Sequence, residues 1–249
     1  MLQIHQFPCL SDNYGFLIHD PASGATAAID TPDAEEILRQ ADAKGWRITD
    51  IWNTHWHPDH AGGNAAITAK TGAVMTGPAE VERIGTAPNR VVDEDDRVML
   101  GNIEARVLNV GGHTLGHIAY LFDADNVAFV GDALFALGCG RLFEGTPLQM
   151  WTSLQKLAAL PDDATLYCAH EYTQSNARFA LAVDPGNAAL RARAIEIDHL
   201  RAAGKPTVPM TLRLEKETNP FLRAPELLPG VADWEAFASI RKQKDEFKG

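Results

Sequence analysis

The sequence has few cysteines, fewer basic than acidic residues, and no long apolar run. Its three cysteines among 249 residues, Cys9, Cys139 and Cys168, are an odd and widely spaced set that suits neither a disulfide framework nor a thiolate zinc site. Lys and Arg number 22 against 33 Asp and Glu, so the net charge is −11 with neutral histidine. This acidity argues against nucleic acid and anionic membrane surfaces as partners. No stretch approaches the roughly 20 apolar residues that span a bilayer.

What is present is the composition of a globular protein, with 45% hydrophobic and 22% charged residues. The length suits one large domain or two modest ones. The first residues, MLQIHQFPCLSDNYGF, lack the basic and then apolar segments of a secretion signal, so we expect a cytoplasmic protein. We also expect a monomer whose partner is a small molecule.

Short β-type runs alternate with helical patterns over the first two thirds of the chain. They predict strands at residues 3–7, 15–19, 26–30, 50–54, 73–76, 97–100, 103–110, 117–122, 126–130 and 165–168. One helix is expected to have Thr31 as N-cap, to begin at Pro32 and to end at Gly45, and others are expected at 62–71 and 147–160. After about residue 170 strand signals nearly vanish, and helices are expected at 176–183, 187–203 and 233–247. The chain therefore predicts an α/β region followed by a helical extension.

The segment THWHPDH, residues 54–60, holds three of the nine histidines of the chain and a carboxylate. It follows an apolar strand-like run, and in an extended backbone His55 and His57 share a face. Pro58 disfavours helix at His57 and bends the chain, so that Asp59 and His60 address a second position. Imidazole and carboxylate without thiolate suit zinc, iron or manganese in a catalytic site. We therefore interpret the segment as a metal-binding motif rather than a polar surface loop.

Further ligands are expected at the ends of other strands. His113 follows the run IEARVLNVGG, Asp132 follows NVAFVG, and His170 ends the run TLYCAH. Any one of these residues alone is as consistent with a structural role as with metal binding. Their shared position at strand ends makes a metal site the better interpretation.

These residues belong to longer motifs, namely PCLSDNYGFLI, THWHPDH, GHTLGH, FVGDALFALGCGRLFEGT, CAHEYT, ETNPFLR and RKQKDEF. Together they resemble the metallo-β-lactamase fold superfamily and, within it, glyoxalase II, the hydroxyacylglutathione hydrolases. The resemblance implies an α/β fold, the αββα metallo-β-lactamase sandwich with a C-terminal helical domain. It implies a catalytic domain over residues 1–170 and a helical, substrate-binding domain over residues 171–249.

The same resemblance implies two divalent metal ions, with zinc expected and iron or manganese as alternatives. It assigns one ion to His55, His57 and His113 and the other to Asp59, His60 and His170, with Asp132 bridging both. Asp59 and Asp132 would also be catalytic, because they would orient a metal-bridging hydroxide. Water bound in such a site has its pKa lowered to about 7, so that a nucleophile exists at neutral pH.

The implied reaction is hydrolysis of S-D-lactoylglutathione to D-lactate and glutathione, the second step of methylglyoxal detoxification. The implied substrate contacts are Arg141, Phe143, Tyr172, Arg241 and Lys244. Arg241 and Lys244 are i and i+3 on one predicted helix and can share a face. Two positions depart from common members: Phe143 replaces a tyrosine whose hydroxyl could bind the glutathione backbone, and Arg141 replaces a lysine.

The ligand set leaves the roles of Asp30 and His117 open, and the proposed hydrolysis has four alternatives. Asp30 is a candidate to support the ligands or a helix-terminal acid, and we expect His117 to be structural because the ligand set is already complete. The complete second ligand set disfavours a persulfide dioxygenase, because these enzymes use a single iron. Beta-lactam hydrolysis would normally accompany export, and RNA processing conflicts with the acidity. A non-catalytic metal-binding module is the remaining alternative.

Overall fold

The computed structural model describes residues 1–248. They form two compact units, and each is described by itself. The first unit comprises Met1–Asn109 and Gly116–Gly131, and the second unit comprises Val110–Leu115 and the described residues from Asp132 onward.

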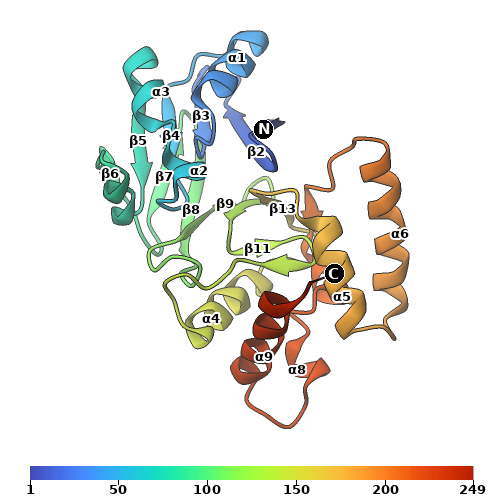
Figure 1. Cartoon of the computed structure of the whole chain (residues 1–249). Helices are drawn as coiled ribbons and strands as arrows, with labels where there is room; N and C mark the ends of the chain where they lie inside the picture. The colour runs from blue at the N-terminus through green and yellow to red at the C-terminus, as the bar shows by residue number, and fades with distance from the viewer. Residues whose placement is uncertain (249) are drawn as a thin grey trace. The chain divides into compact units, whose positions relative to one another are not determined.

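The first unit contains a six-stranded sheet in the order β1-β2-β3-β4-β5-β6. The strands are β1 (Gln3–Cys9), β2 (Asn13–His19), β3 (Thr26–Ile29), β4 (Asp50–Trp52), β5 (Val74–Gly77) and β6 (Arg90–Val91). The first two pairings are antiparallel and the remaining three are parallel. Parallel neighbours need crossover connections, which here carry α1 (Ala34–Lys44) and α3 (Asn64–Thr71) (Figure 1).

A second, antiparallel group of strands completes the sandwich of the first unit. It runs in the order β10-β9-β8-β7, with β7 (Arg97–Leu100), β8 (Ile103–Asn109), β9 (Ile118–Phe122) and β10 (Val127–Gly131). Aromatic rings from both sheets meet between the layers. Trp52 packs on Tyr120 with ring centroids 5.2 Å apart, and Phe16 meets Phe129 edge to face at 5.3 Å. All four side chains are buried, so the two sheets share one apolar core.

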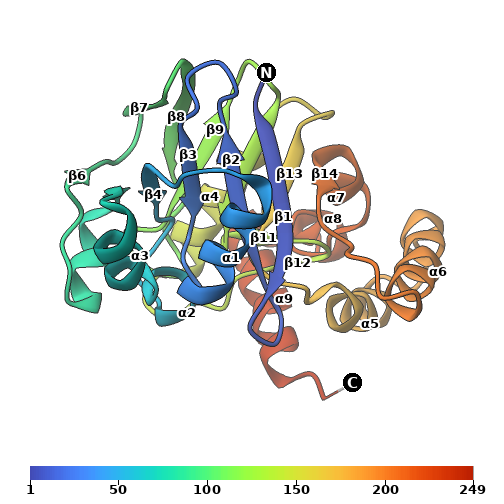
Figure 2. The ribbon, with the colours of Figure 1, turned by 90° about the horizontal axis from the view of Figure 1, so that it is seen from above.

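Helices α1 and α3 cover the outer face of the first sheet (Figure 2). Ile37 and Ala41 of α1 and Ile67 of α3 pack with Leu17 and Ile51 of the sheet. Because apolar side chains gather on the face of the helix that packs on the sheet, they recur with the 3.6-residue period that predicts a helix from the sequence.

The start of α1 differs from the sequence prediction. The N-cap is Asp33, whose carboxylate accepts hydrogen bonds from the backbone N–H groups of Glu35 and Glu36. Thr31 is instead buried, and its hydroxyl donates to Asn64 Oδ1 at 2.7 Å. A threonine engaged in a long-range bond of this kind is unavailable to cap the helix. The predicted end at Gly45 is confirmed, with a left-handed φ of 69°.

The second unit is mainly helical. It contains α4 (Pro147–Ala158), α5 (Thr173–Val183), α6 (Ala188–Ala202), α7 (Leu212–Thr218), α8 (Ala224–Leu227) and α9 (Asp233–Glu246). Helices α5 and α6 lie side by side around a core that includes Ala180, Leu190 and Ile197 (Figure 1). Helix α4 packs against α9, where the rings of Trp151 and Phe237 are 6.1 Å apart.

Short strands lie among these helices. They are the hairpin β11 (Leu134–Phe135) and β12 (Gly138–Cys139), and the antiparallel pair β13 (Thr165–Cys168) and β14 (Met210–Thr211). Strand β13 precedes residue 170, yet it pairs with β14 and belongs to the second unit together with the helices. The domain division at residues 170 and 171 stays a prediction.

All ten predicted strands have counterparts within a few residues of their expected ends. The two-residue strands β6, β11, β12 and β14, the short helices α2 (Pro58–Ala61), α7 and α8, and the 3₁₀ helix η1 (Ala79–Ile84) were not predicted. These elements are shorter than the roughly 11–18 residues over which a helical period, or the roughly 4–8 residues over which strand alternation, is recognised in a sequence.

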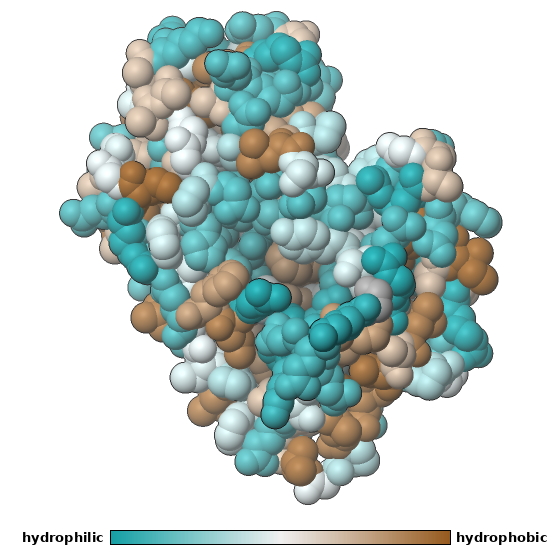
Figure 3. All heavy atoms as spheres, viewed as in Figure 1, coloured by the Kyte–Doolittle hydropathy of each residue, from teal (hydrophilic) through white to brown (hydrophobic). Residues whose placement is uncertain are grey.

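The surface is mixed in polarity. On the face that Figure 3 shows, hydrophobic residues are interspersed among hydrophilic ones. Isolated exposed apolar side chains of this kind are normal for a folded chain. Among residues 1–248, none of the helices combines the length and the apolar character needed to cross a bilayer.

Candidate metal centre

The seven predicted ligands fall into two groups, one within each unit. The first unit contributes His55, His57, Asp59 and His60 from the turn that follows β4. Pro58 is the first residue of α2, and His57 precedes it with φ −57° and ψ 148°, the extended conformation that proline imposes on its predecessor. The motif therefore begins extended, as predicted, and ends on the single helical turn of α2, which was not predicted.

Ligand-type atoms of this group lie close together. His55 Nε2 is 3.1 Å from His57 Nδ1, and His60 Nε2 is 3.6 Å from Asp59 Oδ2. His55 and His60 are buried, while the side chain of Asp59 is 40% exposed. The Asn13 side-chain amide donates to both Asp59 O and Asp59 Oδ2 at 3.2 Å, which fixes the carboxylate from the side.

Asp30, whose role the sequence left open, lies beneath this turn. Its carboxylate accepts hydrogen bonds from Thr54 N at 2.7 Å and from Thr54 Oγ1 at 2.8 Å, and it contacts His60 Nδ1 at 2.8 Å. A carboxylate only accepts hydrogen bonds, so His60 donates through Nδ1 and its Nε2 is left as the ligand atom. Asp30, His55 and His60 themselves form a group of ligand-type atoms within 4.8 Å.

His117 also supports the turn. Its ring stacks on that of His55, with centroids 4.5 Å apart and planes at 20°, and it is fully buried. This position behind a predicted ligand agrees with the structural role expected for His117.

The second unit brings together His113, Asp132 and His170, three residues that are far apart in the sequence. Asp132 Oδ2 is 3.4 Å from His113 Nε2, and Asp132 Oδ1 is 3.3 Å from His170 Nε2. All three side chains are buried. His113 Nδ1 donates to the carbonyl oxygen of Arg141 at 2.7 Å, which leaves His113 Nε2 as the ligand atom.

The donor spacing within each unit fits a metal ion. Ligand atoms about 2.0–2.2 Å from a tetrahedral zinc are about 3.3–3.6 Å from one another. The carboxylate–imidazole distances given above, 3.3, 3.4 and 3.6 Å, lie in this range. They are longer than charge-assisted hydrogen bonds, which are typically about 2.7–2.9 Å. These three carboxylate–imidazole pairs are thus spaced as ligands of a common ion, whereas His55 Nε2 and His57 Nδ1, 3.1 Å apart, are also within hydrogen-bond distance of each other.

The cysteines take no part in this arrangement. All three are buried free thiols. Burial raises the pKa of Cys9 and Cys168 to about 12 and that of Cys139 to about 11. None of the three belongs to the groups of ligand-type side chains found among the described residues, and those groups offer only nitrogen and oxygen donors.

Three predicted substrate contacts lie close to the ligands of the second unit. The ring of Tyr172 stacks on that of His170, with centroids 4.6 Å apart and planes at 4°. Phe143 meets the ring of His113 edge to face at 5.3 Å and is 59% exposed. The guanidinium of Arg141 lies 5.9 Å from the Phe143 ring centre. These side chains offer aromatic and cationic groups beside the candidate ligands.

Arg241 and Lys244 share α9 but differ in surroundings. Arg241 is 7% exposed, and its guanidinium donates to Cys139 O at 3.0 Å and to Asp245 Oδ1 at 2.8 Å. Lys244 Nζ donates to Ser175 O at 3.2 Å. Burial, and then the charges of Arg241 and Arg178, lower the pKa of Lys244 to about 8. The substrate role of both residues stays a prediction, with Lys244 the more accessible cation.

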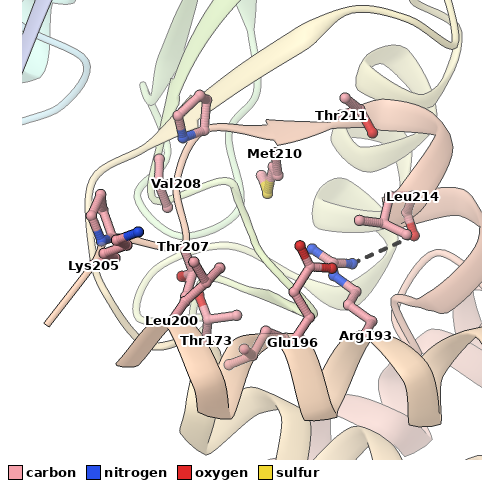
Figure 4. A pocket seen from close by; sticks show the side chains of 13 residues that line it. Thr173, Arg193, Glu196, Leu200, Lys205, Thr207, Val208, Met210, Thr211 and Leu214 are labelled. Carbon is pink, nitrogen blue, oxygen red and sulfur yellow. Dashed lines mark hydrogen bonds between the residues drawn. The ribbon is translucent and has the colours of Figure 1, made fainter. Parts of the chain in front are cut away.

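A separate pocket in the second unit contains none of the predicted site residues. It has a volume of about 470 Å³ and lies between α6 and the segment that leads into β14 (Figure 4). Ile197, Leu200 and Met210 line it, and Arg193 stands at its wall, where it donates to Leu214 O. Sequence analysis gave no signal for this pocket, because its walls come from segments that carry no motif of ligand-type residues.

The fold and the site define a class of protein. The model of the metallo-beta-lactamase superfamily matches residues 15–170, which is more than half of the chain. The chain is therefore a member of this superfamily, and its His and Asp groups indicate a binuclear metal site. Among solved structures, ETHE1 from Myxococcus xanthus superposes with a TM-score of 0.72 and 26% identity over 96% of this chain and 90% of that one.

The particular family follows from the remainder of the chain. The model described as the hydroxyacylglutathione hydrolase C-terminus matches residues 171–247. Hydroxyacylglutathione hydrolases from Erythrobacter litoralis and Maricaulis maris are 58% and 54% identical, covering 99% of this chain and 100% and 99% of their own. The chain belongs to the hydroxyacylglutathione hydrolase family, whose fold and metal-dependent hydrolase class were predicted and are confirmed.

Proposed function

We propose that the protein hydrolyses 2-hydroxyacyl-glutathione thioesters, S-D-lactoylglutathione first among them, to the free acid and glutathione. The observation that carries this proposal is the pair of imidazole–carboxylate groups, each with its atoms at the spacing of metal ligands. The names of the full-length relatives supply the substrate class.

The proposed metal assignment is the one that the sequence motifs imply. One ion would be held by His55, His57 and His113, the other by Asp59, His60 and His170, and Asp132 would serve both. Its two oxygens, which lie near His113 and His170 respectively, support this double role. Zinc is our first choice, and iron and manganese accept the same donors. When bound, the ions supply a water of lowered pKa and a Lewis acid for the thioester carbonyl.

The chain's own residues orient the reactants. Asp59 and Asp132 hold their carboxylates beside the ligand histidines and can accept a proton from the attacking water. The leaving thiolate has a parent thiol with pKa near 8.5, so it departs without a general acid. No side chain has to be found for that task.

Substrate binding is proposed to use cations and rings. Arg141 and Lys244 offer positive charge to the carboxylates of glutathione in a chain whose net charge is −11. Tyr172 and Phe143 offer ring faces next to the ligands. The missing hydroxyl at Phe143 removes one hydrogen bond, worth roughly 0.5–1.5 kcal/mol. The cytoplasmic location and the monomeric state remain predictions from the sequence.

A substrate panel tests the proposal. Steady-state rates are measured with S-D-lactoylglutathione, two other acyl-glutathiones and a cephalosporin, on protein of measured metal content. We expect the highest kcat/KM for the lactoyl thioester and no turnover of the cephalosporin. Cephalosporin hydrolysis with no thioester turnover would contradict the proposal.

A matched pair of variants links the activity to the site. Asp132→Ala is expected to abolish turnover while the far-ultraviolet circular dichroism stays unchanged. Asp163→Ala removes an exposed carboxylate of the same unit and is expected to leave kcat unaltered. An active Asp132→Ala variant would remove Asp132 from the site.

A further inference from the structure

The segment Phe135–Cys139, here called the hairpin segment, has side chains bonded to the backbone of every one of its residues. Each bond joins one of its N–H or C=O groups to a side chain from the C-terminal part of the second unit. The bonds are Asn219 Nδ2 to Phe135 O and Gly138 O, Asn176 Nδ2 to Ala136 O, Leu137 N to Glu215 Oε2, and Arg241 Nη1 to Cys139 O, all 2.9–3.2 Å long. These four side chains lie 40 or more residues away in the sequence and fix the backbone of the hairpin segment. They are here called the clamp.

Glu215 is central to this clamp. It is fully buried, and besides Leu137 N its carboxylate accepts a hydrogen bond from Asn219 Nδ2 at 3.0 Å. Its charge is balanced by an ion pair with Arg193, which is also buried and which donates to Thr218 Oγ1 at 2.6 Å. A buried carboxylate persists only when its lone pairs and charge are satisfied, and here they are. Neutralising Glu215 would leave the Arg193 charge uncompensated.

The middle of the hairpin segment is held in an unfavourable conformation. Leu137 has φ +57°, a left-handed value that a leucine adopts only when its surroundings impose it. The Leu137 N–H is bonded to Glu215, and the Leu137 side chain packs with Ala180 and Leu190. The conformation therefore depends on contacts with α5, α6 and α7 rather than on local preference.

Both ends of the hairpin segment lead to candidate ligands. Asp132 lies just before it in the sequence, and Arg141, whose carbonyl accepts the hydrogen bond from His113 Nδ1, lies just after it. Gly140 lies close to both candidate ligands. A Cβ at this position would come within 2.1 Å of Asp132 O and 3.0 Å of His113 Nδ1. A shift of the segment would therefore move the Asp132 backbone and the acceptor that orients His113.

We infer that Glu215 is a positioning residue for Asp132 and His113, acting through the hairpin segment. The inference rests on the metal assignment of the proposed function. Glu215 lies two residues before the ETNPFLR motif, and its partners include Thr218 and Asn219 of that motif through the Arg193 ion pair and the Asn219 hydrogen bond. Glu215 does not touch the ligands. Its effect is to fix the distance between Asp132 and His113 before a metal ion arrives, so it contributes to metal affinity and not to binding of the thioester.

The test measures metal affinity and local opening in Glu215→Gln. Affinity is determined by competition of the metal-free protein with a chromophoric chelator, and amide hydrogen exchange is followed in the metal-free protein. We expect affinity to fall about 10-fold or more, the size of effect typical for partners of metal ligands, and exchange to accelerate in residues 134–141. KM of the reloaded variant is expected to stay within twofold of the parent protein. Unchanged metal affinity would overturn the inference.

Two further variants separate positioning from general destabilisation. Lys216 lies on α7 with Glu215, and Lys216→Ala breaks its exposed ion pair with Asp162. This variant is expected to change neither readout. Asn176→Ala removes only the bond to Ala136 O and is expected to act in the same direction as Glu215→Gln, more weakly. If Glu215→Gln fails to fold, unchanged affinity in Asn176→Ala overturns the inference.

The readouts also separate this inference from the proposed function. Neither chelator competition nor hydrogen exchange involves a thioester. A parent protein that binds two ions, loses affinity in Glu215→Gln and hydrolyses no thioester would contradict the proposed function alone.

Discussion

At the scale of single residues, two of the candidate ligands are oriented by hydrogen-bond acceptors at the ring nitrogen opposite the expected ligand atom. Asp30 holds His60 through Nδ1, and the Arg141 carbonyl holds His113 through Nδ1. In both cases the partner accepts the hydrogen bond, so each ring is left with Nε2 free of its proton. The protein thereby selects one tautomer for each histidine without any metal being required.

Asp30→Asn reverses this selection at His60. The amide of asparagine can place an N–H against Nδ1, which shifts the imidazole proton to Nε2, the proposed ligand atom. We expect metal affinity to fall about 10- to 100-fold, measured by chelator competition. Asp42→Asn, an exposed change on α1, is the control and should leave affinity unaltered. Equal affinities in the two variants would mean that Asp30 does not set the tautomer.

If Lys244 binds the substrate as proposed, the substrate affinity is expected to depend on pH. Burial, followed by the charges of Arg241 and Arg178, lowers the pKa of Lys244 to about 8. Below that pH the ammonium is charged and can hold a glutathione carboxylate, and above it the amine is neutral. We therefore expect KM for the thioester to rise as the pH passes from 7 to 9 while kcat changes little.

The matched variant for this effect is Lys244→Arg, because arginine stays charged throughout the range. KM of Lys244→Arg should be flat between pH 7 and 9, and KM of Lys244→Ala should be high at every pH. A parent KM that does not change over this range would show that Lys244 does not bind the substrate.

At the scale of helices and strands, the cap of α1 shows where local sequence rules reach their limit. Threonine followed by proline is a typical helix start, yet Asp33 caps the helix and Thr31 bonds to Asn64. Asp33→Ala should reduce the free energy of unfolding by about 0.5–2 kcal/mol, measured by urea titration of the metal-free protein. Asp33→Ser keeps a capping oxygen and should be close to the parent protein. A stability of Asp33→Ala equal to the parent would contradict the cap seen in the structure.

The same limit explains what else could and could not be predicted. The strands and the candidate ligands could be predicted, because alternation marks a strand and because His113, Asp132 and His170 follow or end apolar runs. The hairpin β11–β12 was not readable, since nearly every residue around it is buried and no alternation exists. Its bonds to Glu215 and Asn219 span about 80 residues, and no local pattern reports such contacts. The motif ETNPFLR could be recognised in the sequence, but the hydrogen bonds of its Thr218 and Asn219 could not be predicted.

At the scale of the whole molecule, the question is whether the metal ions hold the fold or only the chemistry. The first unit has its own apolar core, in which Trp52 packs on Tyr120 and Phe16 on Phe129. The hairpin segment of the second unit is held by Glu215 and its partners. Both sets of contacts are made by side chains that are not candidate metal ligands. We therefore expect the architecture to be stable without the ions, which would add only the binding free energy of the folded state.

Metal removal should accordingly separate activity from structure. After dialysis against a chelator, we expect thioester hydrolysis to be lost while the far-ultraviolet circular dichroism is retained and Tm falls, because ligands that bind only the folded state no longer contribute. Adding back zinc to the metal-free protein should restore both activity and Tm. A structural ion would behave differently, since its loss would unfold the chain as it does in small zinc domains. Loss of secondary structure on chelation would thus contradict a site built from preformed ligands and favour a non-catalytic metal-binding module.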